Sequence, residues 1–244
     1  MHVVDNIAAF KQLQKGEKAT LALNNAQVIY TWTSNKGNTS AYIRDNTGAI
    51  VFYKSTLGLA ANEILNGPVS GSFDLYNSLP EFLEIEGLTN LNNVTRSNGE
   101  AAAAKAITVA EAMDNLCDLV KIADTEITSE TVKDKNGKDV VNYYLVSGEA
   151  KVQLYNGFHL DAFNDLGSFA VAGKKYTVEG ILGAVFKGVA EIYPTSITEE
   201  ANGISSLNND ARSLNAPIYN LAGQRVSSDY KGVVIQNGKK MLKK

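Results

Sequence analysis

The chain has 244 residues, of which 44% are hydrophobic and 20% are charged, and its formal net charge is −3. This composition is typical of a globular protein and excludes an intrinsically disordered chain and a coiled coil. No run of about 18 apolar residues occurs, so the sequence predicts no transmembrane helix. The single cysteine, Cys117, excludes an internal disulfide and any metal site built from several cysteines.

Charge is unevenly distributed along the chain. Residues 213–244 contain six basic residues and one acidic residue, so this segment carries +5 and the rest of the chain carries −8. A protein that binds phosphates must neutralise them with lysine and arginine. The distribution therefore argues against nucleic acid as a partner of the main body of the chain.

Alternating apolar and polar residues predict five short strands in the first part of the chain. The first strand covers 19–32, and Asn24-Asn25 interrupts its period of two, which indicates a bulge or bend. The other strands are predicted at 40–45, 49–54, 66–76 and 80–88. The sequence DNTG at 45–48 predicts a tight hairpin, in which Asp45 caps the turn.

Two short helices accompany these strands. Residues 6–13 have an amphipathic pattern with Ile7 and Phe10 on one side, and residues 57–65 are expected to be helical. Five strands with a helix between the third and the fourth are typical of the OB-fold, a small Greek-key barrel.

The same order recurs in the second part of the chain. A helical segment at 110–116 precedes strands that are predicted at 117–128, 142–148, 149–155, 174–182 and 188–194, with helix-like residues at 161–169. In the alignment of the two halves, Val178 and Gly180 match Val69 and Gly71, and Glu191-Ile192 matches Glu84-Ile85. We interpret this as a diverged tandem duplication.

The fold class predicted is therefore all-β with short helices: two tandem five-stranded Greek-key barrels of the OB-fold type, followed by a C-terminal β-hairpin. The predicted boundaries are 1–92 for the first barrel, 93–106 for a linker, 107–198 for the second barrel, 199–215 for a second linker and 216–244 for the hairpin. About 30 residues are too few to hold a core of their own, so the hairpin is expected to dock on something or to be recognised by something.

The tail resembles the short C-terminal sorting domain of secreted Bacteroidetes proteins. The resemblance lies in IYNLAGQRV at 218–226 and KGVVIQNGKK at 231–240. The residues that carry it are Tyr219, Asn220, Gly223, Val226, Gly232, Asn237, Gly238, Lys239 and Lys240. It implies export by type IX-like secretion, recognition by the secretion machinery, and an extracellular or cell-surface location. It also implies an N-terminal signal peptide, which this sequence does not begin with.

The first repeat is similar to OB-like modules of secreted Bacteroidetes proteins. The similarity lies in the hairpin sequence YIRDNTGAIVFY at 42–53 and in NGPVSG at 66–71. The second repeat keeps the hydrophobic pattern but has Ser147-Gly148 in place of the DNTG turn. A shared fold does not fix a shared function.

OB-folds bind ligands on the face of their second and third strands, often with exposed aromatic side chains. In the first repeat this outward face is either Tyr42, Arg44, Val51 and Tyr53 or the complementary set Ala41, Ile43, Ile50 and Phe52. We place the first set outward because it is more polar. Tyr30 and Trp32 extend this surface, and Tyr144, Gln153 and Tyr155 form the corresponding candidate surface of the second repeat. The alternative is that these rings close the barrel or pack against the second domain.

Other candidate sites have simpler structural interpretations. His159 has no second histidine at metal-binding spacing, Cys117 is expected to be a buried thiol, and DKNGKD at 134–139 is expected to be a hairpin turn rather than a calcium loop. Glu84 and Glu86, with Glu81 nearby, suggest a glycosidase pair, but we expect a solvated strand face because no apolar pocket is evident.

The sequence contains none of the common nucleophile, zinc or phosphate-loop motifs, so it predicts no catalytic residues, no metal and no cofactor. The expected function is that of a non-enzymatic, secreted or surface ligand-binding protein, with glycan preferred because the barrels are acidic. A single-stranded nucleic-acid binder and a structural spacer or adhesin component of the cell surface remain as alternatives.

Overall fold

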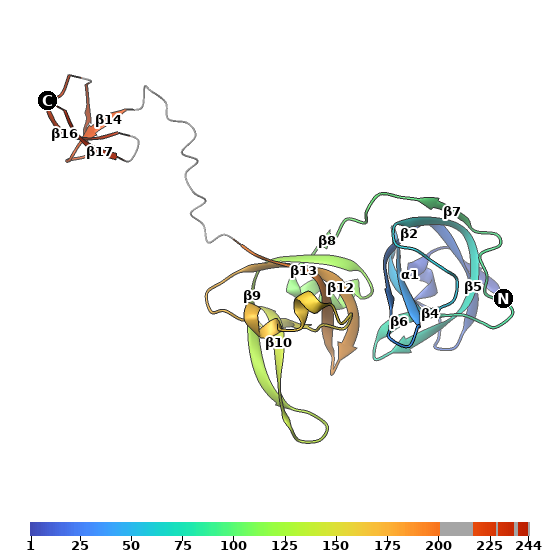
Figure 1. The fold of residues 1–244 in the computed structure, drawn as a ribbon. Coiled ribbons are helices and arrows are strands. Elements are labelled where there is room, and N and C mark those ends of the chain that lie inside the picture. Colours follow the sequence, from blue (N-terminus) through green and yellow to red (C-terminus); the bar gives the residue numbers. More distant parts are fainter. Residues whose placement is uncertain (201–216, 228, 237–238, 244) are drawn as a thin grey trace. The chain divides into compact units, whose positions relative to one another are not determined.

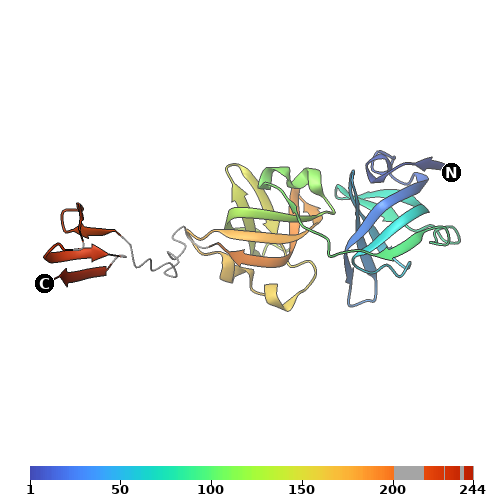
Figure 2. The ribbon, with the colours of Figure 1, turned by 90° about the horizontal axis from the view of Figure 1, so that it is seen from above.

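The computed structural model describes residues 1–200, 217–227, 229–236 and 239–243. The chain divides into two compact units, Met1–Glu200 and Ala201–Lys244, and the first unit contains both predicted barrels (Figures 1 and 2). Among the described residues, no helix is both long enough and apolar enough to cross a membrane.

The first barrel consists of five strands that close on themselves. They are β2 (Lys18–Thr33), β3 (Thr39–Asp45), β4 (Gly48–Ser55), β5 (Glu63–Tyr76) and β6 (Leu79–Leu83). β2 pairs with both β3 and β5, and β4 pairs in parallel with β6, which gives the closed order β2-β3-β4-β6-β5. This is the strand order of the OB-fold. β2 can serve both halves because it bends at Asn24-Asn25, where Asn25 has a φ of 47° and the pairing register shifts, as predicted.

The short helix α1 (Ile7–Phe10) covers one end of this barrel. Ile7 and Phe10 are fully buried, and the Phe10 ring packs against Phe73 and Phe82 of the barrel core. Asp45 links the helix to the β3–β4 hairpin. One oxygen of its carboxylate accepts a hydrogen bond from the Thr47 amide at 2.7 Å, and the other accepts one from the Ile7 amide at 2.9 Å. The predicted capping role of Asp45 is therefore confirmed, and it extends to the helix.

The second barrel has the same strand order. It consists of β9 (Leu119–Lys133), β10 (Asp139–Ser147), β11 (Ala150–Leu154), β12 (Tyr176–Phe186) and β13 (Val189–Glu199), and it is closed by the β9–β10 pairing. β11 pairs in parallel with β13, as β4 does with β6. Three 3-10 helices accompany the strands: η1 (Val109–Asn115), η2 (Asp161–Phe163) and η3 (Leu166–Phe169). The prediction of two tandem OB-type barrels is confirmed.

In each half, a short strand that the sequence analysis did not predict precedes the first barrel strand. β1 (His2–Val4) pairs in parallel with β2, and β8 (Lys105–Ala106) pairs in parallel with β9. The segment 93–106, predicted as a linker, connects the two barrels but also contributes β7 (Thr95–Asn98), which pairs with β5, and the whole of β8. A β-strand followed by a short helix therefore precedes the long first strand in both repeats.

Two sequence predictions need correction. The helix expected at 57–65 is absent, because Gly58 and Asn62 have positive φ values of 63° and 72° and β5 already begins at Glu63. The alignment of Glu191 with Glu84 is also wrong. Glu191 lies opposite Gln153 in the β11–β13 pair, and the corresponding position in the β4–β6 pair, opposite Val51, is Glu81.

The two barrels pack through a cluster of aromatic side chains that we call the Phe158 contact, made by Phe158 with Tyr30, Trp32, Tyr42 and Tyr193. Ring centroids are 4.6 Å apart for Tyr30, 5.9 Å for Trp32, 6.0 Å for Tyr42 and 5.1 Å for Tyr193. The indole nitrogen of Trp32 also donates to the carbonyl of Phe158 at 3.0 Å. Phe158 belongs to the second barrel, so side chains of both barrels form one continuous hydrophobic cluster.

The Arg44–Asp118 ion pair is a polar contact between the barrels. The guanidinium lies 3.0 Å from the Asp118 carboxylate, which is nearly buried, and it also donates to the carbonyl of Ala103. Burial raises the pKa of Asp118, and the charge of Arg44 opposes that rise.

The C-terminal unit is a small antiparallel sheet rather than a simple hairpin. Its strands are β14 (Ile218–Asn220), β15 (Arg225–Val226), β16 (Gly232–Gln236) and β17 (Lys239–Lys243), in the order β15-β14-β16-β17. Ile218 and Val234 are its buried hydrophobic residues in the described part. The predicted pairing of the last two strands is present, with Gln236 opposite Lys239.

The residues of the predicted sorting motif lie on these strands and their turns. Tyr219 pairs with Arg225, and Val226 lies opposite Ile218. Asn220 closes a turn in which its side-chain oxygen accepts from the amides of Ala222 and Gln224, and Gly223 within this turn has a φ of 78°. Gly232, Lys239 and Lys240 lie on β16 and β17, whereas Asn237 and Gly238 are outside the described residues.

Replacing Phe158 with alanine tests the Phe158 contact. We expect a loss of about 3–5 kcal/mol in the free energy of unfolding, because the change removes a buried ring and leaves a cavity. Trp32, the single tryptophan, should become more accessible to water, so its native emission should shift to longer wavelength. Phe73→Ala is the matched control, because Phe73 is buried in the core of the first barrel. It should destabilise similarly without shifting the emission, and an unshifted emission in Phe158→Ala would contradict the contact.

Candidate functional site

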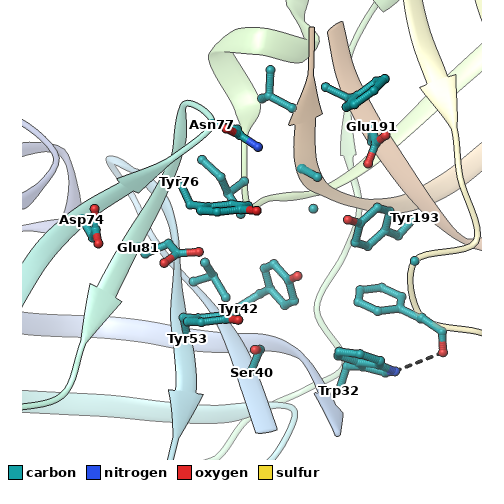
Figure 3. Close-up of a pocket in the computed structure, with 18 of the residues that line it drawn as sticks. Trp32, Ser40, Tyr42, Tyr53, Asp74, Tyr76, Asn77, Glu81, Glu191 and Tyr193 are labelled. Carbon is teal, nitrogen blue, oxygen red and sulfur yellow. Dashed lines mark hydrogen bonds between the residues drawn. The ribbon is translucent and has the colours of Figure 1, made fainter. Parts of the chain in front are cut away.

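A cleft with a volume of about 620 Å³ lies between the two barrels, beside the Phe158 contact. The first barrel lines it with side chains from β2 to β6, including the β5–β6 turn at Tyr76 and Asn77. The second barrel lines it with Gly157, Phe158 and residues of β12 and β13. Figure 3 shows Glu81, Tyr42 and Tyr53 from the first barrel and Glu191 and Tyr193 from the second.

Aromatic side chains form much of the cleft wall. They are Trp32, Tyr42, Tyr53, Tyr76, Phe158, Phe186 and Tyr193. Tyr76 and Tyr53 are 66% and 40% exposed, so their rings are accessible to a ligand. The floor is less accessible, because Tyr42 is only 5% exposed beneath the second barrel.

Tyr193 is fixed in this wall by two glycines. A Cβ atom placed on Gly157 or Gly183 would lie 2.4 or 2.5 Å from the Tyr193 ring, which is closer than real side chains approach. Glycine at these two positions therefore allows the ring to lie flat against the backbone of the second barrel. Burial raises the pKa of both Tyr193 and Tyr42, so both phenols stay protonated and can donate hydrogen bonds.

Two nearly buried carboxylates line the cleft, one from each barrel. Glu81 is 6% exposed and Glu191 is 8% exposed, and they occupy equivalent positions in the two repeats. Burial raises the pKa of Glu191 and raises that of Glu81 to about 7, with a further contribution from the nearby charge of Asp74. Asp74, opposite Glu81 on β5, is paired with Lys15 at 2.5 Å, and the hydrogen bond from Lys15 lowers its pKa.

The expectation that Glu81 lies on a solvated strand face is therefore wrong. Glu84 was the glutamate paired with Glu191 in the sequence alignment, but its carboxylate accepts hydrogen bonds from Ser55 and Thr56 at 2.7 and 2.6 Å. The apolar pocket that the sequence did not reveal is assembled from both barrels, so it exists only in the folded unit.

The sequence predicted correctly which side chains of β3 and β4 point out of the first barrel, but not how exposed they are. The complementary set points inward and lies in the core of this barrel: Ala41, Ile43, Ile50 and Phe52. Tyr42 and Val51 point outward but are buried under the second barrel. Trp32, Tyr42 and Tyr53 line the cleft.

Two more of the predicted residues make contacts between the two barrels. The Tyr30 ring stacks on Phe158, and the Arg44 guanidinium is held by Asp118 and the Ala103 carbonyl. The alternative interpretation, in which rings of the first repeat pack against the second domain, therefore holds for Tyr30. Trp32 and Tyr42 combine both roles, because each contacts Phe158 and also lines the cleft. Arg44 is not among the cleft residues.

The candidate residues of the second barrel lie elsewhere. Gln153 and Tyr155 line a smaller hollow of about 310 Å³, together with His159 and several asparagines. Tyr144 and Gln153 are each 6% exposed, which corrects the expectation of an open surface there. The Lys151 ammonium lies 4.5 Å from the centre of the Tyr144 ring and covers it. Tyr155 is 46% exposed.

The remaining sequence candidates are structural. Cys117 is fully buried, its thiol donates to the Pro80 carbonyl, and burial raises its pKa, so it is an inert thiol as expected. The side chain of Asp134 accepts from the amides of Asn136 and Lys138 and closes the predicted turn. Among the described residues, no group of three or more metal-ligating side chains is present.

Sequence reasoning missed Tyr76, Asn77, Phe158, Glu191 and Tyr193 as parts of one site. Only the pairing of the parallel strands could have identified Glu191 as the partner of Glu81. That register, Gln153 opposite Glu191 and Val51 opposite Glu81, joins strands that are distant in sequence, so residue spacing alone does not reveal it.

No protein-family model and no curated protein matches the chain. Among solved structures, the crystal structure of the tetrameric p202 HIN2 matches 77% of this chain and 94% of that chain, with 11% identity and a TM-score of 0.30. The crystal structure of fission yeast Pot1 and ssDNA matches 81% of this chain and 88% of that chain, with 11% identity and a TM-score of 0.32. At these TM-scores neither match bears on function, and the fold assignment rests on the strand order.

The Glu81→Gln variant tests whether the cleft destabilises a charged carboxylate. The pKa of Glu81 rises from 4.5 to about 7 on folding, so wild-type stability falls as the pH rises between these values. At pH 8 the variant should be more stable than wild type by up to about 3 kcal/mol, and near pH 4 the two should be similar. Urea unfolding across this pH range measures the difference. Glu86→Gln, at an exposed position, should change little, and a variant that gains no stability at pH 8 would contradict the assignment.

Proposed function

We propose that this protein is a non-enzymatic glycan-binding protein and that the cleft between its barrels is the binding site. The observation that supports this most strongly is the composition of the cleft wall: accessible tyrosine rings beside three carboxylates, those of Asp74, Glu81 and Glu191, with no lysine or arginine among the described residues that line it.

This chemistry suits a sugar. Aromatic rings provide flat apolar surfaces against which the carbon–hydrogen faces of sugar rings pack, and Tyr53 and Tyr76 are the accessible ones. Sugar hydroxyls need polar partners, and Ser40, Asn77 and the carboxylate of Glu81 or Glu191 supply them. The volume of the cleft is in the range of small-molecule sites and suits a short oligosaccharide.

Single-stranded nucleic acid is the alternative occupant, because OB-folds stack bases on the strand face from which Tyr42 and Tyr53 project. Each nucleotide also brings a phosphate that has to be neutralised. Glu81, Glu191 and Asp74 would oppose those phosphates, and the main body of the chain is acidic. The charge of the cleft therefore favours an uncharged or positively charged ligand.

Binding without catalysis is the simpler proposal. Catalysis of glycosidic hydrolysis needs an acid and an ionised carboxylate on either side of the bond. Glu81 has the raised pKa of an acid, but the pKa of Glu191 is raised as well, and the Asp74 carboxylate is neutralised by Lys15. Burial thus shifts the pKa of both glutamates in the same direction, whereas an acid and its ionised partner need environments that shift their two pKa values apart.

The test is calorimetric binding of the full chain to a panel of oligosaccharides and to a single-stranded oligonucleotide, each at low and at physiological salt. We expect oligosaccharide binding that changes little with salt and weakens at least about tenfold in Tyr53→Ala and Tyr76→Ala, since each loses a stacking ring. Tyr155→Ala is the matched control, because Tyr155 is similarly exposed but lies outside the cleft.

Three other outcomes would overturn the proposal. Oligonucleotide binding that falls steeply with salt would identify a nucleic-acid binder. Release of new reducing ends from a bound oligosaccharide would identify an enzyme. Binding to neither class of ligand would favour a structural spacer or adhesin component of the cell surface.

We further propose that the protein is exported and that residues 216–244 act as its sorting segment, recognised by the secretion machinery. The support is the sequence resemblance described above, together with the division of the chain into two compact units, of which this segment belongs to the second. In a bacterium with type IX-like secretion, the chain preceded by a signal peptide should reach the surface or the medium, and deletion of residues 217–244 should retain it in the periplasm. Equal export of both forms, measured by fractionation, would remove the sorting role without affecting the binding proposal.

A further inference from the structure

Glu81 and Glu191 are exceptional among the acidic residues of the barrels. Each is more than nine-tenths buried, and Figure 3 shows both in the wall of the cleft, one from each barrel. In the described part of the chain, neither carboxylate takes part in an ion pair or a side-chain hydrogen bond. Asp118 is comparably buried, but Arg44 neutralises it at 3.0 Å.

A largely buried carboxylate without a counterion is unfavourable, because burial removes part of its hydration and no opposite charge compensates for the loss. The charged groups that act on Glu81 are Asp74, which opposes its ionisation, and Lys15 and Lys54, which favour it. Lys15 is engaged by Asp74, and the Lys54 ammonium lies 5.1 Å from the centre of the Tyr53 ring. Among the described residues, none therefore places a cation inside the cleft, although the chemistry of the cleft favours one.

The aromatic side chains of the cleft wall also favour a positively charged ligand. Ring faces attract cations through their electron density, and the effect is stronger when water is excluded. Tyr42, Tyr53, Tyr76, Tyr193 and Trp32 line the cleft together with the two carboxylates. A ligand with a positively charged group would satisfy both features, whereas a neutral sugar would leave the carboxylates without a counterion.

We infer that the cleft binds an amino sugar with a free ammonium group, held between the aromatic side chains and the carboxylates of Glu81 and Glu191. This inference rests on the proposed glycan-binding function and names the class of sugar. The ammonium group supplies the missing counterion, and the pyranose ring supplies the apolar face for Tyr53 and Tyr76.

The test compares two trisaccharides that differ only in acetylation: the trimer of glucosamine and the trimer of N-acetylglucosamine. By calorimetry near neutral pH, the full chain should bind the glucosamine trimer at least about tenfold more tightly. The preference should disappear in the double variant Glu81→Gln/Glu191→Gln, which removes both charges and keeps the side-chain shape. Glu86→Gln, on the exposed surface, should retain it.

Proton release provides a second measurement. An ammonium group stabilises the ionised form of Glu81, so binding at a pH at which the sugar amine is already protonated should release protons from the protein, and the apparent enthalpy should depend on the buffer. Glu81→Gln should remove the part of this release that comes from the protein. The N-acetylglucosamine trimer, which has no amine, should release few protons.

The outcomes separate this inference from the proposed function. Equal binding of the two trimers, or a preference that persists in the double variant, would overturn the inference and leave glycan binding intact. Failure of the chain to bind any oligosaccharide would overturn the proposed function, and the inference with it.

Discussion

The arrangement of the whole first unit depends on the Phe158 contact. Phe158 lies just after the third strand of the second barrel and packs against three aromatic side chains of the first barrel. One part of the outward face of β3 and β4 is thereby buried as an interface. The rest of that face, with Tyr53 and the β5–β6 turn, stays accessible and becomes one wall of the cleft. The cleft exists because the second barrel covers the ligand face of the first only in part.

This arrangement also explains how a duplicated barrel can have a site that neither copy has alone. Glu81 and Glu191 are equivalent by strand pairing, so each barrel supplies one copy of the same carboxylate position. Burial in the cleft wall desolvates both and raises the pKa of each. Keeping carboxylates at these positions lowers the stability of the folded protein. Residues that lower stability are common at functional sites.

Local patterns in the sequence predicted the barrels well because barrel strands alternate between inside and outside. The set Ala41, Ile43, Ile50 and Phe52 was correctly placed inside, since four apolar residues at alternate positions can be satisfied only by a core. The bend at Asn24-Asn25 and the DNTG hairpin were also predictable from residues that tolerate positive φ. Each of these features is decided within a few residues of the chain.

The features that the sequence did not reveal depend on contacts between distant segments. β7 has four exposed residues and no apolar alternation, so only its pairing with β5 defines it as a strand. The apolar run at 57–65 suggested a helix, but Gly58 and Asn62 adopt left-handed conformations and the end of the run joins β5. The burial of Tyr42 and Glu81 required the position of the second barrel, which alternation within one strand cannot give.

The measurement that tests the central claim most directly is the fluorescence of Trp32 during titration with an oligosaccharide whose binding has been established by calorimetry. Trp32 is the single tryptophan and lines the cleft, so a ligand bound there must change its surroundings. We expect that emission and acrylamide quenching of Trp32 both change, and that they saturate at the same ligand concentration as the calorimetric signal. Calorimetric binding with unchanged Trp32 emission and unchanged quenching would place the ligand elsewhere and contradict the account.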